Sequence, residues 1–194
     1  MHSPADASLA AVGPKGAGRI ALPPNALPLG FVEHAFELEF TIETSRARVW
    51  AWLDDPETFT RGQVWPFRVE FLSPNRDVAA GFSEGSVNVH HGPLLCLPGV
   101  LNEITEGRFR DLRYFYGSYV GSLRLLRPTR LAFWVADGFE TGTTTVKVRL
   151  ESFVNRRIAR LWTAAQRLFW RRFQRWMSRA LEAPLYEPRS GSAR

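Results

Sequence analysis

The sequence predicts a single α+β domain in which a curved antiparallel β-sheet wraps around one long C-terminal α-helix. Three observations support this fold class. Hydrophobic and polar residues alternate in several segments, which is typical of strands with one buried and one solvated face. Two short helical segments follow the first strand, and a long run with helical spacing of apolar residues comes last. The 194 residues suffice for one compact domain and are too few for two.

The N-terminal part of the chain divides into a leader, a strand and two helices. Residues 1–32 are expected to be a disordered leader, because Pro and Gly interrupt every short hydrophobic piece, and the domain is expected over residues 33–184. The first strand is predicted at residues 36–44, FELEFTIET, where every second residue is apolar. Thr44 and Ser45 are helix N-cap residue types, and the helix RARVWAWLDD should end at the Asp55-Pro56 pair. A short helical turn is expected at residues 57–61.

A run of about five or six strands follows. They are predicted in WPFRVEFLSPN, EGSVNVHHGP, GVLNEITE, RDLRYFYGSYV, TRLAFWVAD and TTTVKVRLESF, and the pattern leaves the registers of the third, fourth and fifth open. In EGSVNVHHGP the alternation is interpreted as placing Val87, Val89 and His91 on the apolar face, with Asn88 and His90 on the opposite one. A sheet of this length, curved around one helix, is expected to enclose a cavity.

The last helix is predicted within residues 155–182, NRRIARLWTAAQRLFWRRFQRWMSRALE. This stretch holds eight arginines and one glutamate, a net charge of +7, so the rest of the chain carries −1 of the total of +6. On a helical wheel Arg172 falls inside the apolar stripe, where it could face a ligand or instead reach water or an acidic partner. Residues 185–194 are expected to be a flexible tail. The predicted stripe comprises Ile158, Leu161, Trp162, Ala165, Leu168, Phe169, Phe173 and Trp176.

Motifs for metal or cofactor chemistry are missing from the sequence. It contains no P-loop, no GxSxG, no HExxH and no dinucleotide fingerprint after a strand, so no cofactor is predicted. His90 and His91 are adjacent on a strand and cannot chelate one ion together, so no metal site is predicted either. The single cysteine, Cys96, excludes an internal disulfide, fits a cytoplasmic location and is expected to be buried and inert.

Three stretches carry a resemblance to a known family. FTIETSRARVWAWLDDPETF looks like the opening strand and helix of the START-like or Bet v 1-like (SRPBCC) superfamily, FSEGSVNVHHG is similar to its Glu-Gly step into the third strand, and TRLAFWVADGFETGTTTVKVRLESF resembles its last hairpin. The similarity covers roughly residues 35–182. It implies the helix-grip fold, with a deep apolar cavity closed by the C-terminal helix that holds lipids, quinones, sterols or polyketides. Family members include carriers and enzymes, and no single catalytic motif spans them.

The resulting hypothesis is a protein that binds or carries a hydrophobic small molecule, such as a lipid, isoprenoid quinone or polyketide. An alternative is a polyketide-type cyclase or dehydratase using Arg172, His91 and a tyrosine. A second alternative is an RNA- or ribosome-associated module using the basic helix, although the near-neutral remainder of the chain does not favour a nucleic-acid partner. Peripheral contact with an anionic membrane fits the arginine face, and the pattern leaves monomer and homodimer open. The expected ligand-binding residues are Phe40, Phe67, Val89, His91, Tyr114, Tyr116, Phe133, Trp162, Phe169 and Arg172.

Overall fold

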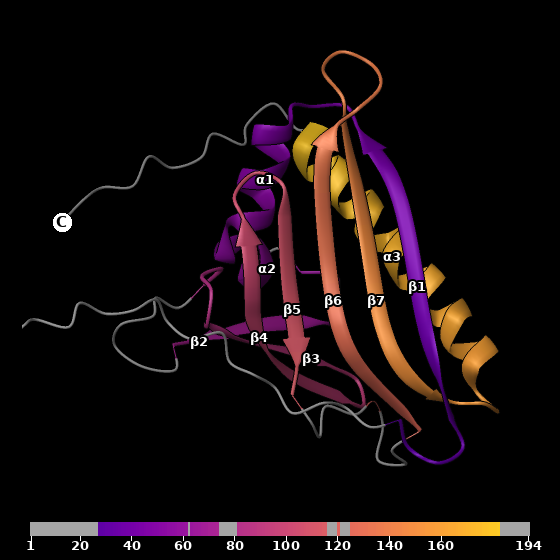
Figure 1. Ribbon diagram of the computed structural model, residues 1–194. Helices are drawn as coiled ribbons and strands as arrows, with labels where there is room; N and C mark the ends of the chain where they lie inside the picture. The colour runs from indigo at the N-terminus through magenta and orange to yellow at the C-terminus, as the bar shows by residue number, and fades with distance from the viewer. Residues whose placement is uncertain (1–26, 62, 74–80, 116–119, 121–124, 183–194) are drawn as a thin grey trace, which may run out of the picture.

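The computed structural model describes residues 27–61, 63–73, 81–115, 120 and 125–182. They form a seven-stranded antiparallel sheet of order β1-β7-β6-β5-β4-β3-β2, with two short helices after β1 and one long helix at the end (Figure 1). The predicted α+β helix-grip fold class is therefore confirmed. The elements are β1 (Phe31–Ile42), α1 (Arg46–Asp54), α2 (Pro56–Arg61), β2 (Arg68–Leu72), β3 (Val87–Gly92), β4 (Leu95–Thr105), β5 (Phe109–Tyr114), β6 (Leu126–Asp137), β7 (Thr144–Asn155) and α3 (Ala159–Glu182).

The boundaries of the first three elements follow from capping chemistry and from alternation. β1 begins at Phe31, earlier than the alternating run, and pairs with β7 along its whole length. The Ser45 side chain accepts a hydrogen bond from the backbone amide of Arg48 at 3.4 Å and so caps α1. Asp55 ends α1, and its side chain accepts a hydrogen bond from the Glu57 amide at 2.8 Å, with Pro56 at the first position of α2. One Asp-Pro step thus ends one helix and starts the next.

The sheet is curved, and α3 covers only part of its concave face. Figure 1 shows α3 lying along the β1 and β7 side, while β2 and β3 run across the ends of β4 and β5 at the other side. The N-terminal half of α3 is attached to β1, because Thr163 Oγ1 donates to the Ala159 carbonyl and is 2.8 Å from His34 Nε2. None of the helices in the described part of the chain is long and apolar enough to cross a bilayer.

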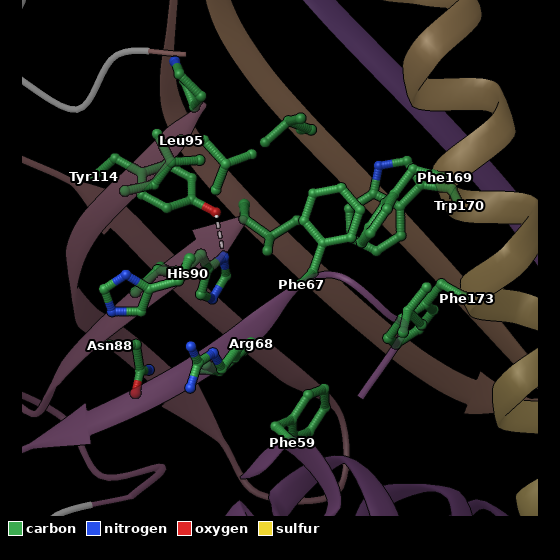
Figure 2. Close-up of a pocket in the computed structure, with 18 of the residues that line it drawn as sticks. Phe59, Phe67, Arg68, Asn88, His90, Leu95, Tyr114, Phe169, Trp170 and Phe173 are labelled. Carbon is green, nitrogen blue, oxygen red and sulfur yellow. Dashed lines mark hydrogen bonds between the residues drawn. The ribbon is translucent and has the colours of Figure 1, made fainter. Parts of the chain in front are cut away.

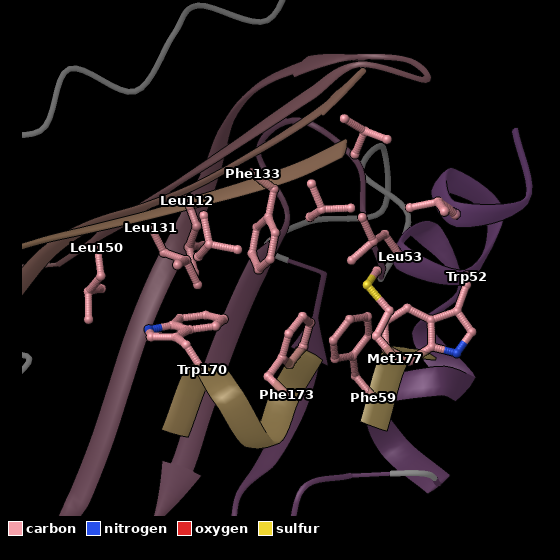
Figure 3. Packing of buried hydrophobic residues seen from close by; sticks show 14 of the residues in the cluster. Trp52, Leu53, Phe59, Leu112, Leu131, Phe133, Leu150, Trp170, Phe173 and Met177 are labelled. Atoms are coloured by element: carbon pink, nitrogen blue, oxygen red, sulfur yellow. The ribbon is translucent and has the colours of Figure 1, made fainter. Parts of the chain in front are cut away.

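A cluster of aromatic rings holds the C-terminal half of α3 against the short helices. Trp52 of α1 lies 4.7 Å from Trp176 and 6.1 Å from Phe173 between ring centroids, both in edge-to-face geometry. Phe59 of α2 lies 5.9 Å from Trp176. Figure 3 shows Phe173 and Met177 directed from α3 into the apolar layer beside Phe59. Edge-to-face pairs of this kind stabilise a core beyond the area they bury.

The buried face of α3 differs from the predicted stripe. Phe173 and Trp176 lie on the packed side as expected, but Leu161 and Leu168 are 70% and 55% exposed. The apolar residues of α3 extend over more than half of its circumference, so the wheel alone does not show which part of that arc meets the sheet. Packing against both the sheet and α1 selects the arc centred on Phe173. The buried residues of α3 are Gln166, Trp170, Phe173, Met177 and Leu181.

The outer face of the sheet carries a chain of charges centred on the fully buried Asp111. Its carboxylate accepts hydrogen bonds from Arg130 Nε at 2.6 Å, from Arg113 Nε at 2.8 Å and from Asn102 Nδ2 at 3.1 Å. These contacts join β4, β5 and β6 side by side. A buried carboxylate is tolerated because several donors replace its lost hydration. Asp111 thus connects three neighbouring strands on the outer face, while apolar packing holds the inner face.

Replacing Asp111 with Ala should lower the free energy of unfolding by about 2–3 kcal/mol, because two arginines lose their buried partner while remaining partly solvated. Asp137→Ala is the control, since its ion pair with Arg46 at 3.2 Å is largely exposed. That change should cost less than about 1 kcal/mol. Denaturant unfolding monitored by circular dichroism measures both values, and equal losses would contradict the structural role of Asp111.

Candidate ligand cavity

A cavity of about 240 Å³ lies between the concave face of the sheet and the free side of α3. Aromatic and aliphatic side chains make up most of its wall. From α3 come Trp162, Phe169 and Trp170, and from the sheet come leucines of β4 and β5 together with Phe133 of β6. A concave, largely apolar wall with a few polar groups is typical of small-molecule sites.

Phe67, just before β2, joins the outer strands to α3 at one side of the cavity. Its ring packs on Gly92, where a Cβ atom would come within 2.8 Å of Phe67 Cε1. The same ring lies 4.9 Å from Phe169 in edge-to-face geometry. Figure 2 shows Phe67 directed across the cavity toward Phe169 and Trp170. The contact between Phe67 and Phe169 is therefore part of the boundary of the cavity on this side.

A tyrosine and a histidine form a hydrogen-bonded pair on the sheet side of the cavity. The Tyr114 hydroxyl lies 2.9 Å from His90 Nδ1, as the dashed line in Figure 2 shows. The pairing registers align Asn88 of β3 with Gly99 of β4, and Gly99 with Tyr114 of β5. A Cβ atom at Gly99 would come within 2.7 Å of the Arg113 carbonyl oxygen, so only glycine fits between these two strands here. The Oδ1 atom of Asn88 is buried and has no hydrogen-bond partner among the described residues.

Burial moves the pKa values of this pair apart. It lowers the pKa of His90 to about 4, and the nearby positive charge of Arg110 acts in the same direction. Burial raises the pKa of the Tyr114 hydroxyl above its ordinary value. Both side chains are consequently neutral at pH 7. They can donate or accept hydrogen bonds within the cavity without carrying charge.

Arg110 of β5 is the buried cation of the site. Its side chain lines the cavity, is 6% exposed, and lies over the Phe82 ring with the guanidinium carbon 3.6 Å from the ring centroid. Arg110 Nη1 donates a hydrogen bond to the Leu53 carbonyl at 2.7 Å. Burial lowers the pKa of Arg110 to about 9, against the opposing effect of Asp54. The guanidinium therefore keeps its charge at neutral pH.

The ten residues expected at the site fall into two groups. Phe40 is buried in the core away from the cavity wall, Val89 is buried without lining it, and Tyr116 lies outside the described residues. Arg172 is exposed on α3 and does not line the cavity. The residues that the structure brings together around the cavity are Phe67, His91, Tyr114, Phe133, Trp162 and Phe169.

The sequence left the orientation of Arg172 open, and on β3 it indicated the wrong face. Arg172 does not turn inward, because the packed arc of α3 is centred on Phe173 and places Arg172 on the solvent side with Leu161 and Leu168.

On β3, Asn88 and His90 face the cavity. His91 lies at the edge of the cavity, with its Nε2 atom 3.0 Å from Glu70 Oε2. The valines of β3 suggested the opposite face, since alternation cannot identify a cavity wall that is itself partly polar.

Sequence reasoning also missed Arg110, although a usable signal was present. In β5 the alternation groups Arg110 with Leu112 and Tyr114, and fixing that register would have placed Arg110 on the cavity side.

Cys96, expected to be buried, is exposed. Among the described residues no cluster of three or more His, Cys, Asp or Glu side chains could hold a metal ion.

Several solved structures share the backbone fold of this chain at low sequence identity. Norcoclaurine synthase from Thalictrum flavum, solved in complex with dopamine and hydroxybenzaldehyde, matches with a TM-score of 0.56 and 11% identity, over 81% of this chain and 91% of that chain. A protein of unknown function from Staphylococcus aureus matches with a TM-score of 0.58 and 11% identity, over 80% of this chain and 97% of that chain. The chain has the Bet v 1-like fold.

This Bet v 1-like assignment confirms the resemblance noted in the sequence at the level of the fold. A protein from Chromobacterium violaceum also matches, with a TM-score of 0.53 and 13% identity over 76% of this chain and 96% of that chain. No protein-family model matches the sequence, and no curated protein matches it. At these identities the likeness concerns the backbone, so the role of each cavity residue has to be argued from its own contacts.

The low pKa of His90 predicts a pH-dependent stability of this Bet v 1-like domain. The native pKa of about 4 lies below the ordinary value of 6.5, so the unfolded chain binds the proton first as the pH falls. The free energy of unfolding should therefore decrease between pH 6.5 and pH 4 by about 2–3 kcal/mol through this one group. Denaturant unfolding of wild type and His90→Gln at several pH values measures it. Parallel pH curves for the two proteins would contradict the assignment.

Proposed function

We propose that the protein binds or carries a hydrophobic small molecule in the cavity between the sheet and α3. The observation that supports this most is the continuous aromatic and aliphatic wall of the cavity, with polar groups restricted to a few positions. A volume of about 240 Å³ lies just below the range of roughly 300–1,000 Å³ that is usual for drug-sized ligands. A compact ring system or short chain fits inside, whereas a long lipid or isoprenoid tail would extend through the mouth.

The protonation states around the cavity support binding over acid–base catalysis. A general acid or base works best when its pKa lies near the operating pH. Burial instead moves the pKa of His90 down and that of Tyr114 up, so neither group exchanges a proton readily at pH 7. A hydrogen-bonded neutral pair can orient a hydroxyl or carbonyl of a ligand. For this reason a carrier is favoured over the cyclase or dehydratase alternative.

The direct test is native mass spectrometry of the protein purified from its own host, followed by solvent extraction. The proposal predicts an additional mass that is released on denaturation and recovered as one organic compound or a narrow group of them. A native mass equal to that of the chain, together with failure to bind the apolar dye N-phenyl-1-naphthylamine, would contradict it.

Ala165 and Ala164 provide a matched pair of variants that locate the binding space. Both are exposed on α3, but only Ala165 lines the cavity. Ala165→Trp should obstruct the cavity and weaken binding of N-phenyl-1-naphthylamine by about tenfold or more, equivalent to at least about 1.4 kcal/mol. Ala164→Trp introduces the same side chain one residue away and should leave the affinity unchanged. Dye titration by fluorescence measures both, and equal effects would place the dye elsewhere.

We further propose that the mouth of the cavity meets an anionic membrane surface. The large exposed apolar residues Trp65, Leu94, Leu161 and Leu168 each adjoin, in sequence, a residue that lines the cavity. Exposed apolar side chains beside arginines are typical of peripheral membrane contacts. Glu182 is the one acidic residue of α3. The exposed arginines of the helix are Arg160, Arg167, Arg171, Arg172, Arg175 and Arg179.

Vesicle sedimentation tests this contact. The protein should bind vesicles containing phosphatidylserine and remain unbound with pure phosphatidylcholine, and 0.5 M NaCl should weaken binding because salt screens exposed charges. Leu161→Ser combined with Leu168→Ser should reduce binding several-fold. Phe139→Ser is the control, since Phe139 is fully exposed without adjoining a cavity residue. Retention of RNA in place of vesicles, unaffected by the leucine changes, would favour the nucleic-acid alternative instead.

A further inference from the structure

The cavity wall has a positive charge that no acidic side chain of the wall balances. Arg110 and Arg68 line the cavity, and no Asp or Glu is among the described residues that do so. Arg68 is exposed and can be solvated from outside. Arg110 is 5% exposed as a residue, and it has lost nearly all of its hydration. The cavity is therefore electropositive as well as apolar.

The protein satisfies Arg110 only in part. A guanidinium has five N–H donors, and one hydrogen bond, from Nη1 to the Leu53 carbonyl, is formed with the described residues. Asp54 Oδ1 lies 4.0 Å from Nη1, beyond hydrogen-bond distance, and its side chain is 42% exposed. The aromatic ring of Phe82 and the C-terminal end of α1 stabilise the cation further. Within the described residues, the other donors of the guanidinium have no hydrogen-bond acceptor.

The part of the wall around Tyr114 offers hydrogen bonds from neutral groups, and the cation on this side, Arg68, is exposed to solvent. Tyr114 lies four residues from Arg110 on the same face of β5, about 13 Å along the strand. Between them Leu112 contributes apolar surface. A molecule bound along this line would meet the buried cation of Arg110 at one end, the apolar surface of Leu112 in the middle and the neutral Tyr114 hydroxyl at the other end. This order suits an amphipathic molecule with one acidic end.

We propose that the ligand of the cavity is a compact apolar carboxylic acid, bound as the carboxylate by the Arg110 guanidinium. This inference rests on the proposed function and specifies the ligand class for the same cavity. Arginine donates two parallel hydrogen bonds to a carboxylate, and the interaction is strong where water is excluded. A bound carboxylate would also accept hydrogen bonds from those donors of Arg110 that have no acceptor among the described residues.

Two probes of nearly equal shape test the inference without any variant. 2-Naphthoic acid is ionised at neutral pH, and 2-naphthamide is its neutral counterpart. Isothermal titration calorimetry at pH 7 should give an affinity for the acid that is about tenfold or more above that for the amide. Equal affinity, or preference for the amide, overturns the inference and leaves the proposed function intact. Failure of both probes to bind contradicts the proposed function as well.

Variants then assign the preference to one residue. Arg110→Met should remove the preference for the acid while the amide still binds, and Arg110→Lys should keep part of it because the charge remains. Arg172→Met is the matched control, with the same loss of charge on the exposed side of α3, and should preserve the full preference. Thermal unfolding monitors the fold of each variant. An unchanged preference in folded Arg110→Met would overturn the role of Arg110.

Discussion

The seating of α3 to one side of the concave sheet is the constraint on which the rest of the structure depends. The helix is held at two places, by His34 and Thr163 at the β1 strand and by Trp52 packed on Phe173 and Trp176 at the short helices. One helix held in this way cannot fill the space inside seven curved strands. The side chains that face the unfilled space lose dispersion contacts on that side. The space on its free side remains as the cavity, with Phe67 bridging from the outer strands to Phe169.

The polar groups within this cavity are arranged so that burial has opposite consequences for different residues. Burial keeps both Tyr114 and His90 neutral. Arg110 remains charged, because the ordinary pKa of a guanidinium is so high that burial lowers it only to about 9. On the outer face Asp111 receives three donors, so that buried charge is satisfied within the fold. The contrast between the satisfied Asp111 and the partly satisfied Arg110 marks the inner face as the side where a partner is missing.

Local patterns predicted the elements of this fold well and the identity of the cavity residues less well. The alternation in β1 and β7, the Ser45 cap and the Asp55-Pro56 boundary are properties of neighbouring residues, and each appears in the structure, although β1 begins at Phe31, before the alternating run. The position of Arg172 depends on which arc of α3 packs against the sheet, and the position of His90 depends on which face of β3 lines the cavity. That choice is made by the curvature of the whole sheet and by packing against α1, neither of which a local pattern contains.

If Arg110 binds the acidic end of the ligand, an acid that enters the space between α3 and the sheet should place its carboxylate at this guanidinium. A crystal structure with 6-bromo-2-naphthoic acid can locate the bound molecule, because the anomalous signal of bromine is independent of its shape. We expect one bromine peak inside the cavity, with the carboxylate density at the Arg110 guanidinium. Bromine found only along the exposed arginines of α3, with the cavity unchanged, would show that the acid does not bind at Arg110.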